Sequence, residues 1–256
     1  MDASWFTNAV IVLVSVSAAI VFLFGVTRAS AADSRQESND FTGAVVAVIG
    51  TTYAVLLAFM LSGVWSMFQQ AQVNAEQEAN DLVSIFRLAS LMEDPARQQL
   101  QDLSRRYAQT AISVEFPAMS RDALPQQEGG QVAAMWKVAA LVQPHSAEES
   151  QALSELVSTL RSFTEHRRIR IMQSREALPT ILWSVLIAGG IITVAASCFF
   201  GVPNFRFHLL QVIVLSFLIS LVLVAIADID RPYQGDVRVV PTGFEFALRT
   251  FSPDNK

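Results

Sequence analysis

Four long apolar stretches constrain what this chain can fold into more than any other feature. They run from about Phe6 to Val26, from Gly43 to Phe68, from Leu178 to Phe200 and from Phe207 to Ala227. A helix needs about 20 mostly apolar residues to cross a bilayer, because its backbone polar groups must all be paired within the helix. None of the four has Asp, Glu, Lys or Arg in its interior. The pattern predicts an all-α integral membrane protein with four transmembrane helices in two hairpins.

The composition points the same way and excludes several classes of protein. Of the 256 residues, 52% are hydrophobic and 16% are charged, whereas soluble domains are about 25% charged. The formal net charge of −5 argues against a basic nucleic-acid-binding protein. One Cys and three His argue against a disulfide scaffold and against a Cys/His zinc site.

The first apolar stretch also fits a second interpretation, a cleaved signal peptide. Ala29-Ser30-Ala31 resembles a signal-peptidase site that follows an apolar run. However, no Lys or Arg precedes the run, and the run is longer than the core of about 7–15 residues that signal peptides have. We therefore favour a retained helix.

The distribution of arginine predicts the orientation in the membrane. Four retained spans place both termini and the polar region between spans two and three on one side. The segment before span three contains Arg161, Arg167, Arg168, Arg170 and Arg175, whereas the opposite loops contain Arg28, Arg35 and Arg206. Positive residues mark the cytoplasmic side. We expect a membrane protein with a hairpin (1–68), a helical cytoplasmic domain (69–177), a second hairpin (178–227) and a cytoplasmic tail (228–256).

Helix start and stop signals divide the cytoplasmic region. Asp94-Pro95 is typical of an N-cap followed by a first helical residue, and Phe116-Pro117 is expected to end that helix. A short helix over 132–142 follows a loop at 125–130. Ser146 with Glu149 fits a capping box.

No stop signal interrupts the segments 69–92 and 146–175. We therefore expect the membrane helices of spans two and three to continue well into the cytoplasm.

Residues that could carry catalysis are scattered. His145, His166 and His208 lie in different segments, and the chain has no phosphate-binding loop or nucleophile elbow. We expect no enzyme, no catalytic residues, no cofactor and no metal site. Asp228 and Asp230 follow span four as a weak candidate for a cation site, but calcium takes six to eight oxygen ligands, which favours an ordinary helix end.

Small residues recur every fourth position in span two. Gly43 with Ala47 forms one such pair, and the longer series is Gly50, Ala54, Ala58 and Ser62. Small faces allow close helix packing in membranes, which explains the pattern without any further function. With the hydroxyls of Thr51, Thr52 and Tyr53, the same face could instead line a narrow pore between several subunits.

Acidic residues beyond span two match basic residues before span three. Glu78 and Asp81 fall on one side of a helix, and an antiparallel partner would present Arg161, Arg167, Arg168 and Arg170. Solvated faces of small energetic value are the simpler interpretation for most of these residues.

The whole arrangement resembles the bacterial bestrophin-like membrane proteins. The resemblance rests on Glu78-Ala79-Asn80 after span two and on the run Asp228 to Gly235, an Asp-x-Asp-Arg-Pro-aromatic-x-Gly pattern directly after span four. It implies a homo-oligomeric ion channel of the bacterial inner membrane, pentameric in known bestrophins, whose second membrane helix lines the pore. Its partners would be the bilayer, further copies of the chain and inorganic ions.

Bestrophins carry a Gly-Phe-Tyr-Val stretch in the pore helix, and this chain has Gly50-Thr51-Thr52-Tyr53-Ala54-Val55 in the comparable place. The resemblance makes six residues candidates for the pore lining: Gly50, Thr51, Thr52, Tyr53, Ala54 and Phe59. The alternative function is a non-conducting membrane scaffold or sensor that binds a partner through its cytoplasmic helices.

Overall fold

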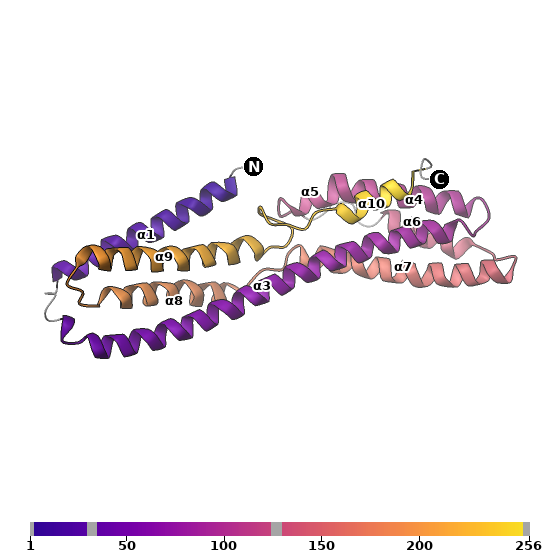
Figure 1. Ribbon diagram of the computed structural model, residues 1–256. Helices are drawn as coiled ribbons and strands as arrows, with labels where there is room; N and C mark the ends of the chain where they lie inside the picture. Colours follow the sequence, from indigo (N-terminus) through magenta and orange to yellow (C-terminus); the bar gives the residue numbers. More distant parts are fainter. Residues whose placement is uncertain (1–2, 30–34, 124–129, 253–256) are drawn as a thin grey trace. The chain divides into compact units, whose positions relative to one another are not determined.

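The computed structural model describes residues 3–29, 35–123 and 130–252. In these ranges the regular structure is entirely helical, without a β-strand (Figure 1). The chain divides into two compact units, one formed by Met1–Ser66 with Ala177–Asp230 and the other by Met67–Glu176 with Arg231–Lys256.

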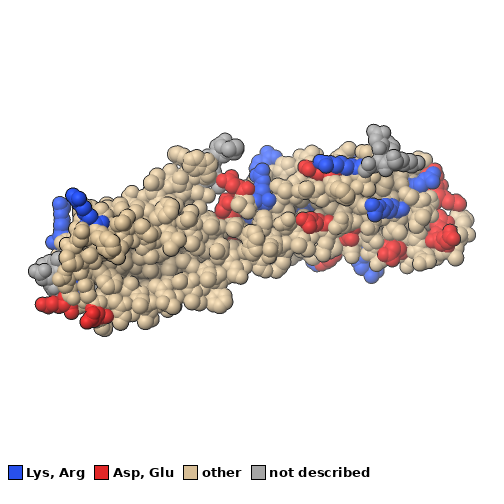
Figure 2. Space-filling view, viewed as in Figure 1, with Lys and Arg blue, Asp and Glu red and all other residues tan. Residues whose placement is uncertain are grey.

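The first unit contains the helices that are long and apolar enough to cross a membrane. They are α1 (Ala3–Ala29), the first part of α3 (Asn39–Ala89), α8 (Thr180–Cys198) and α9 (Phe205–Ile229). The four predicted spans are confirmed, with ends that differ by a few residues. Figure 2 shows the visible surface of these spans free of charged side chains between their ends. Ser30 and Ala31 of the possible cleavage site lie outside the described residues.

Two clusters of apolar residues hold the first unit together. Ala19 and Leu23 of α1 pack with Cys198 of α8 and Val212 of α9. The second cluster joins α3, α8 and α9 through Tyr53, Leu57, Val64, Leu186, Ile219 and Ile226.

Glycines in α8 are needed for this second cluster. A Cβ atom on Gly189 would lie 2.6 Å from the ring of Tyr53. The absence of a side chain therefore lets the ring of Tyr53 lie directly against the backbone of α8.

A reciprocal hydrogen-bond pair joins the start of α3 to the loop between α8 and α9. The Asn39 amide donates to the Gly201 carbonyl and accepts from the Gly201 N–H, both at 2.9 Å. A Cβ atom on Gly201 would lie 2.4 Å from the backbone nitrogen of Gln36. Only glycine allows this loop to approach the backbone of Arg35 and Gln36 so closely.

The second unit is a helical assembly around the rest of α3. It contains α4 (Ala96–Thr110), a π-helical turn η1 (Ala111–Glu115), α5 (Phe116–Met119), α6 (Gly130–Leu141), α7 (Ala147–Gln173) and α10 (Thr242–Thr250). α6 matches the predicted helix over 132–142, while most of the predicted loop over 125–130 lies outside the described residues.

Two predicted helix boundaries are wrong at the ends of α4. The N-cap is Pro95, and Asp94 forms an ion pair with Arg97 at 2.6 Å instead of capping. Phe116-Pro117 does not end the helical path, because Pro117 lies in the first turn of α5, where proline leaves no required hydrogen bond unmade. The π-helical turn precedes it and carries Glu115.

The start of α7 is as predicted, but its end is not. Ser146 is the N-cap and accepts from the Glu149 N–H at 3.0 Å, while the Glu149 carboxylate accepts from the His145 N–H at 2.7 Å. α7 then ends at Gln173, and residues 174–179 separate it from α8. Pro179 interrupts the helix because the residue before a proline disfavours the helical conformation. Continuation beyond the membrane is therefore confirmed for α3, which has 51 residues, and wrong for span three.

Candidate functional site

The membrane part of α3 has one packed face and one exposed face. Tyr53, Leu57 and Val64 are buried and recur at helical spacing. Thr51, Ala58 and Ser62 are exposed. Each residue turns the direction of the side chain by about 100°, which places these exposed residues opposite the packed face. Within the first unit, α3 therefore presents a stripe of small and hydroxyl-bearing residues that no other described helix of the unit covers.

The six candidate lining residues occupy different sides of α3. Thr51, Thr52 and Ala54 are exposed, and Phe59 is 73% exposed. Gly50 is half-buried, with nothing within 4 Å of the position where a Cβ atom would lie.

Tyr53 differs from the other five candidates. Its side chain is buried, and its hydroxyl donates to the Leu186 carbonyl at 2.8 Å. The geometry assigns Tyr53 to packing against α8 and does not favour it as a lining residue.

Asp230 connects the end of α9 to the start of α8. Its Oδ1 accepts from the Leu178 N–H at 2.6 Å and its Oδ2 from the Trp183 indole N–H at 3.3 Å. Because both oxygens accept hydrogen bonds and the side chain is buried, the geometry favours the helix-end interpretation over a cation site with Asp228. Across the described ranges, no group of three or more His, Cys, Asp or Glu could hold a metal ion.

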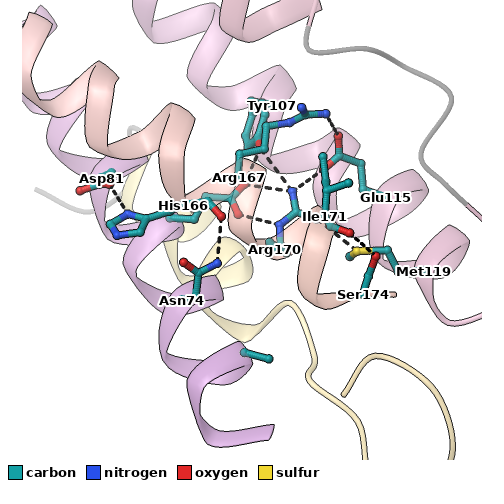
Figure 3. A network of polar contacts seen from close by, with 12 residues as sticks. Asn74, Asp81, Tyr107, Glu115, Met119, His166, Arg167, Arg170, Ile171 and Ser174 are labelled. Carbon is teal, nitrogen blue, oxygen red and sulfur yellow. Dashed lines mark hydrogen bonds and ion pairs between the residues drawn. The ribbon is translucent and has the colours of Figure 1, made fainter. Parts of the chain in front are cut away.

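A cluster of buried charges in the second unit joins α3, α4, η1 and α7 (Figure 3). Arg170 is fully buried, and its Nε and Nη2 donate to the Glu78 carboxylate at 2.6 and 3.0 Å. The same guanidinium forms an ion pair with Glu115, and the Tyr107 hydroxyl donates to Glu78. Arg167 completes the cluster by donating to Glu115 at 2.7 Å.

Apolar and aromatic groups surround these charges. The Arg170 guanidinium lies 5.2 Å from the centre of the Phe116 ring and 5.8 Å from that of Phe244. Such contacts between a cation and an aromatic face are favourable, most strongly where water is excluded. They satisfy the flat faces of the guanidinium, while its edges bind the carboxylates.

The charges of the cluster balance, because two carboxylates face two guanidinium groups. Burial by itself would raise the pKa of Glu115, but Arg170 and Arg167 outweigh it and hold that pKa below the usual value. Burial would likewise lower the pKa of Arg170, and the charge of Glu78 more than compensates. Burial, reinforced by the Glu78 charge, raises the pKa of Tyr107, which stays a neutral donor.

Two further contacts extend the pairing of α3 with α7. His166 Nδ1 lies 2.7 Å from an Asp81 oxygen, and the Asn74 amide donates to the His166 carbonyl at 2.8 Å. The interpretation of solvated charged faces is therefore wrong for Glu78 and Arg170. It holds for Arg168, which is exposed and pairs only along its own helix, with Glu165.

The run after span four anchors the tail on the second unit. The buried Tyr233 donates to the Ala71 carbonyl at 3.3 Å, and its ring meets Phe116 edge-on. Gly235 has a φ of 75°, which suits glycine. The following residues are extended, with the Val239 N–H donating to the Pro232 carbonyl at 2.7 Å.

Comparison with known proteins identifies the family. The sequence matches the Bestrophin-like domain over residues 11–244. The chain belongs to the bestrophin-like family. The comparison with curated proteins found no significant match.

Solved structures share the fold of this bestrophin-like protein. A point variant of a bacterial bestrophin homolog from Klebsiella pneumoniae superposes with a TM-score of 0.68 at 11% identity, covering 94% of this chain and 98% of the other. A structure described only as a membrane protein variant gives a TM-score of 0.63 at 11% identity, with 96% and 97% covered. At such identities the likeness establishes the fold and nothing finer.

The residues on which the family resemblance rests bind or pack against other helices. Glu78 binds Arg170, and Ala79 lies so close to α10 that a Cβ atom on Gly243 would be 2.9 Å from its side chain. Asp230 and Tyr233 fasten the end of span four as described above. Tyr107 and Glu115 escaped the sequence analysis, because nothing local distinguishes a buried Glu or Tyr in an amphipathic helix from an exposed one.

Proposed function

We propose that this bestrophin-like protein is a homo-oligomeric ion channel of the bacterial inner membrane, with α3 lining the pore. Family membership and the four-span helical fold support the channel class. The resemblance to known bestrophins implies five copies. The excess of arginine before span three supports a cytoplasmic second unit.

The observation that carries the proposal is the two-faced membrane part of α3. Its packed face, with Tyr53 and Leu57, is occupied within the subunit. Its opposite face offers Thr51, Ala58 and Ser62, which are exposed. Lipid tails are contacted equally well by Leu, so small and hydroxyl residues are better explained by close approach of further α3 helices around a narrow path.

Flux into liposomes tests the proposal. Purified protein is reconstituted, and chloride, potassium and sodium flux is measured across an imposed gradient. We expect selective flux that Ala54→Leu lowers by more than tenfold, because the larger side chain enters the exposed face of α3. The matched control is Ala188→Leu, an equal change at an exposed residue of α8, which should leave flux unchanged.

Two results would contradict this assignment. Equal flux through the wild type and the Ala54→Leu variant would show that this face of α3 does not line the pore. No flux of any of the three ions, from a verified homo-oligomer, would favour the scaffold or sensor function.

One observation favours that second function. Between α6 and α7 lies a mainly apolar groove of about 430 Å³, lined by Val132, Ala133, Trp136, Ile171 and Met172 together with Thr164, Arg167 and Arg168. A partner helix could place its apolar face there.

A further inference from the structure

We propose that a polar recess in the second unit binds the headgroup of a phosphoethanolamine lipid. The recess has a volume of about 270 Å³ and is lined by Asp122, Ser174, Arg175, Glu176, Arg231 and Gln234. All six belong to the second unit. The inference concerns a site distinct from the pore and does not depend on conduction.

The connectivity of the chain places this recess at the membrane border. Arg175 precedes the first residue of α8 by five positions, and Arg231 follows the last residue of α9 by two. An extended chain spans at most about 3.6 Å per residue. The backbone of Arg175 therefore lies at most about 18 Å from the start of α8 and that of Arg231 at most about 7 Å from the end of α9, whatever the arrangement of the two units. These limits place the recess close to the ends of two spans.

Two charges of the lining are available to a ligand. In the described part of the chain, the side chains of Arg175 and Glu176 have no hydrogen bond or ion pair, even with each other. Asp122, by contrast, accepts from Arg231 at 3.5 Å and from Gln234 at 3.1 Å. Arg175 thus offers a free guanidinium and Glu176 a free carboxylate at one rim.

This pair of opposite charges selects the headgroup. A guanidinium matches the oxygens of a phosphate in bidentate geometry, and a carboxylate accepts hydrogen bonds from a primary ammonium. Phosphoethanolamine carries both groups on one short linker. The lining has two arginines and two carboxylates, so it gives no net positive charge that would favour a purely anionic headgroup.

Choline headgroups fit less well. A quaternary ammonium donates no hydrogen bond and is recognised by aromatic cages, yet no aromatic residue lines the recess. The volume is also just below the range of about 300–1,000 Å³ that encloses whole ligands. A headgroup whose acyl chains remain in the bilayer suits this size.

Native mass spectrometry of the full-length protein tests the proposal. Delipidated protein in detergent is titrated with phosphatidylethanolamine, phosphatidylcholine or phosphatidylglycerol of the same acyl chains. We expect phosphatidylethanolamine to bind most tightly. Arg175→Ala should weaken it about fivefold, the effect of one basic side chain at a membrane surface. Glu176→Gln should weaken phosphatidylethanolamine and leave phosphatidylglycerol unchanged.

Controls separate the recess from general charge effects. Arg168→Ala removes another exposed arginine of the second unit, one that pairs with Glu165, and should change no affinity. Because the substituted side chains are exposed, unfolding temperatures should stay at the wild-type value.

Three results would overturn the proposal. Equal affinity for phosphatidylethanolamine and phosphatidylcholine would show that the recess accepts no hydrogen bond from the primary ammonium. Tighter binding of phosphatidylglycerol, strengthened by Glu176→Gln, would make the recess an anionic-lipid site. Binding of soluble phosphoethanolamine or inorganic phosphate as tight as that of the lipid would identify a free phosphate compound as the occupant.

Discussion

Replacing Arg170 with Met should destabilise the second unit strongly. The variant keeps the length and apolar character of the side chain but leaves Glu78 and Glu115 buried with only Arg167 to balance them, a net charge of −1. Removing one partner of a buried ion pair costs about 3–5 kcal/mol, because a charge stays buried without compensation. For a unit of this size, about 2–4 °C of unfolding temperature corresponds to 1 kcal/mol. We therefore expect a decrease of roughly 6–20 °C.

The measurement is thermal unfolding of the detergent-solubilised protein, followed by hydrogen exchange of peptides from α3 and α7. Arg168→Met on the same helix is the control. This arginine is 63% exposed at the side chain, and exposed pairs contribute under about 1 kcal/mol. The double variant Glu78→Gln with Arg170→Met restores charge balance and should recover part of the loss. A decrease below about 2 °C for Arg170→Met, or no recovery in the double variant, would refute the reasoning.

The stability of the Arg170→Met variant should respond to pH in the opposite sense to that of the wild type. In the wild type the pKa of Glu115 is lowered from its usual 4.5. Its stabilisation is therefore complete above pH 4.5 and is lost as the pH falls through the lowered pKa. Without Arg170, burial should raise the pKa of a carboxyl in the cluster, and acidification should relieve the unfavourable charge. The difference in unfolding temperature between wild type and variant should narrow from pH 7 towards pH 5.

Three further substitutions, followed by thermal unfolding, test contacts that hold neighbouring segments together. Asp230→Ala should destabilise the first unit by about 2 kcal/mol, since two donors lose their acceptor; a neutral result would mean that water replaces the carboxylate. Gly189→Ala should cost about 1–3 kcal/mol by overpacking against Tyr53, whereas Gly25→Ala, with nothing within 4 Å, should be neutral. Tyr233→Phe should cost about 1 kcal/mol through one lost hydrogen bond, and an unchanged unfolding temperature would show that this bond is dispensable.

The elements that the sequence predicted well depend on local chemistry. An uncharged run of about 20 apolar residues has few alternatives to a membrane helix. The four spans could therefore be predicted from the sequence. The cap at Ser146 could be predicted for a similar reason. Its hydroxyl accepts a hydrogen bond from the Glu149 N–H, which lies within one helical turn.

The features that the sequence analysis missed depend on distant partners. Glu78 and Arg170 are 92 positions apart, and only the tertiary fold decides whether such residues meet or are solvated. Tyr53 shows the same limit in the membrane part of α3. Its place in the small and hydroxyl-bearing stretch made it a lining candidate, yet the glycines of α8 create the surface that receives its ring.

The balanced cluster around Arg170 also limits how this part of the molecule can diverge. Lysine could not replace Arg170, because one ammonium cannot bind Glu78 through two donors and Glu115 through the same flat group. A change at any one charged position leaves a buried charge unmatched, so a second position of opposite charge must change with it. At 11% identity, most positions of a sequence alignment do not show which residues correspond. Charged positions that constrain one another should therefore show how α3, η1 and α7 of two distant relatives are to be aligned. We expect distant relatives to be aligned more securely from this buried cluster than from their membrane spans, in which one apolar residue substitutes readily for another.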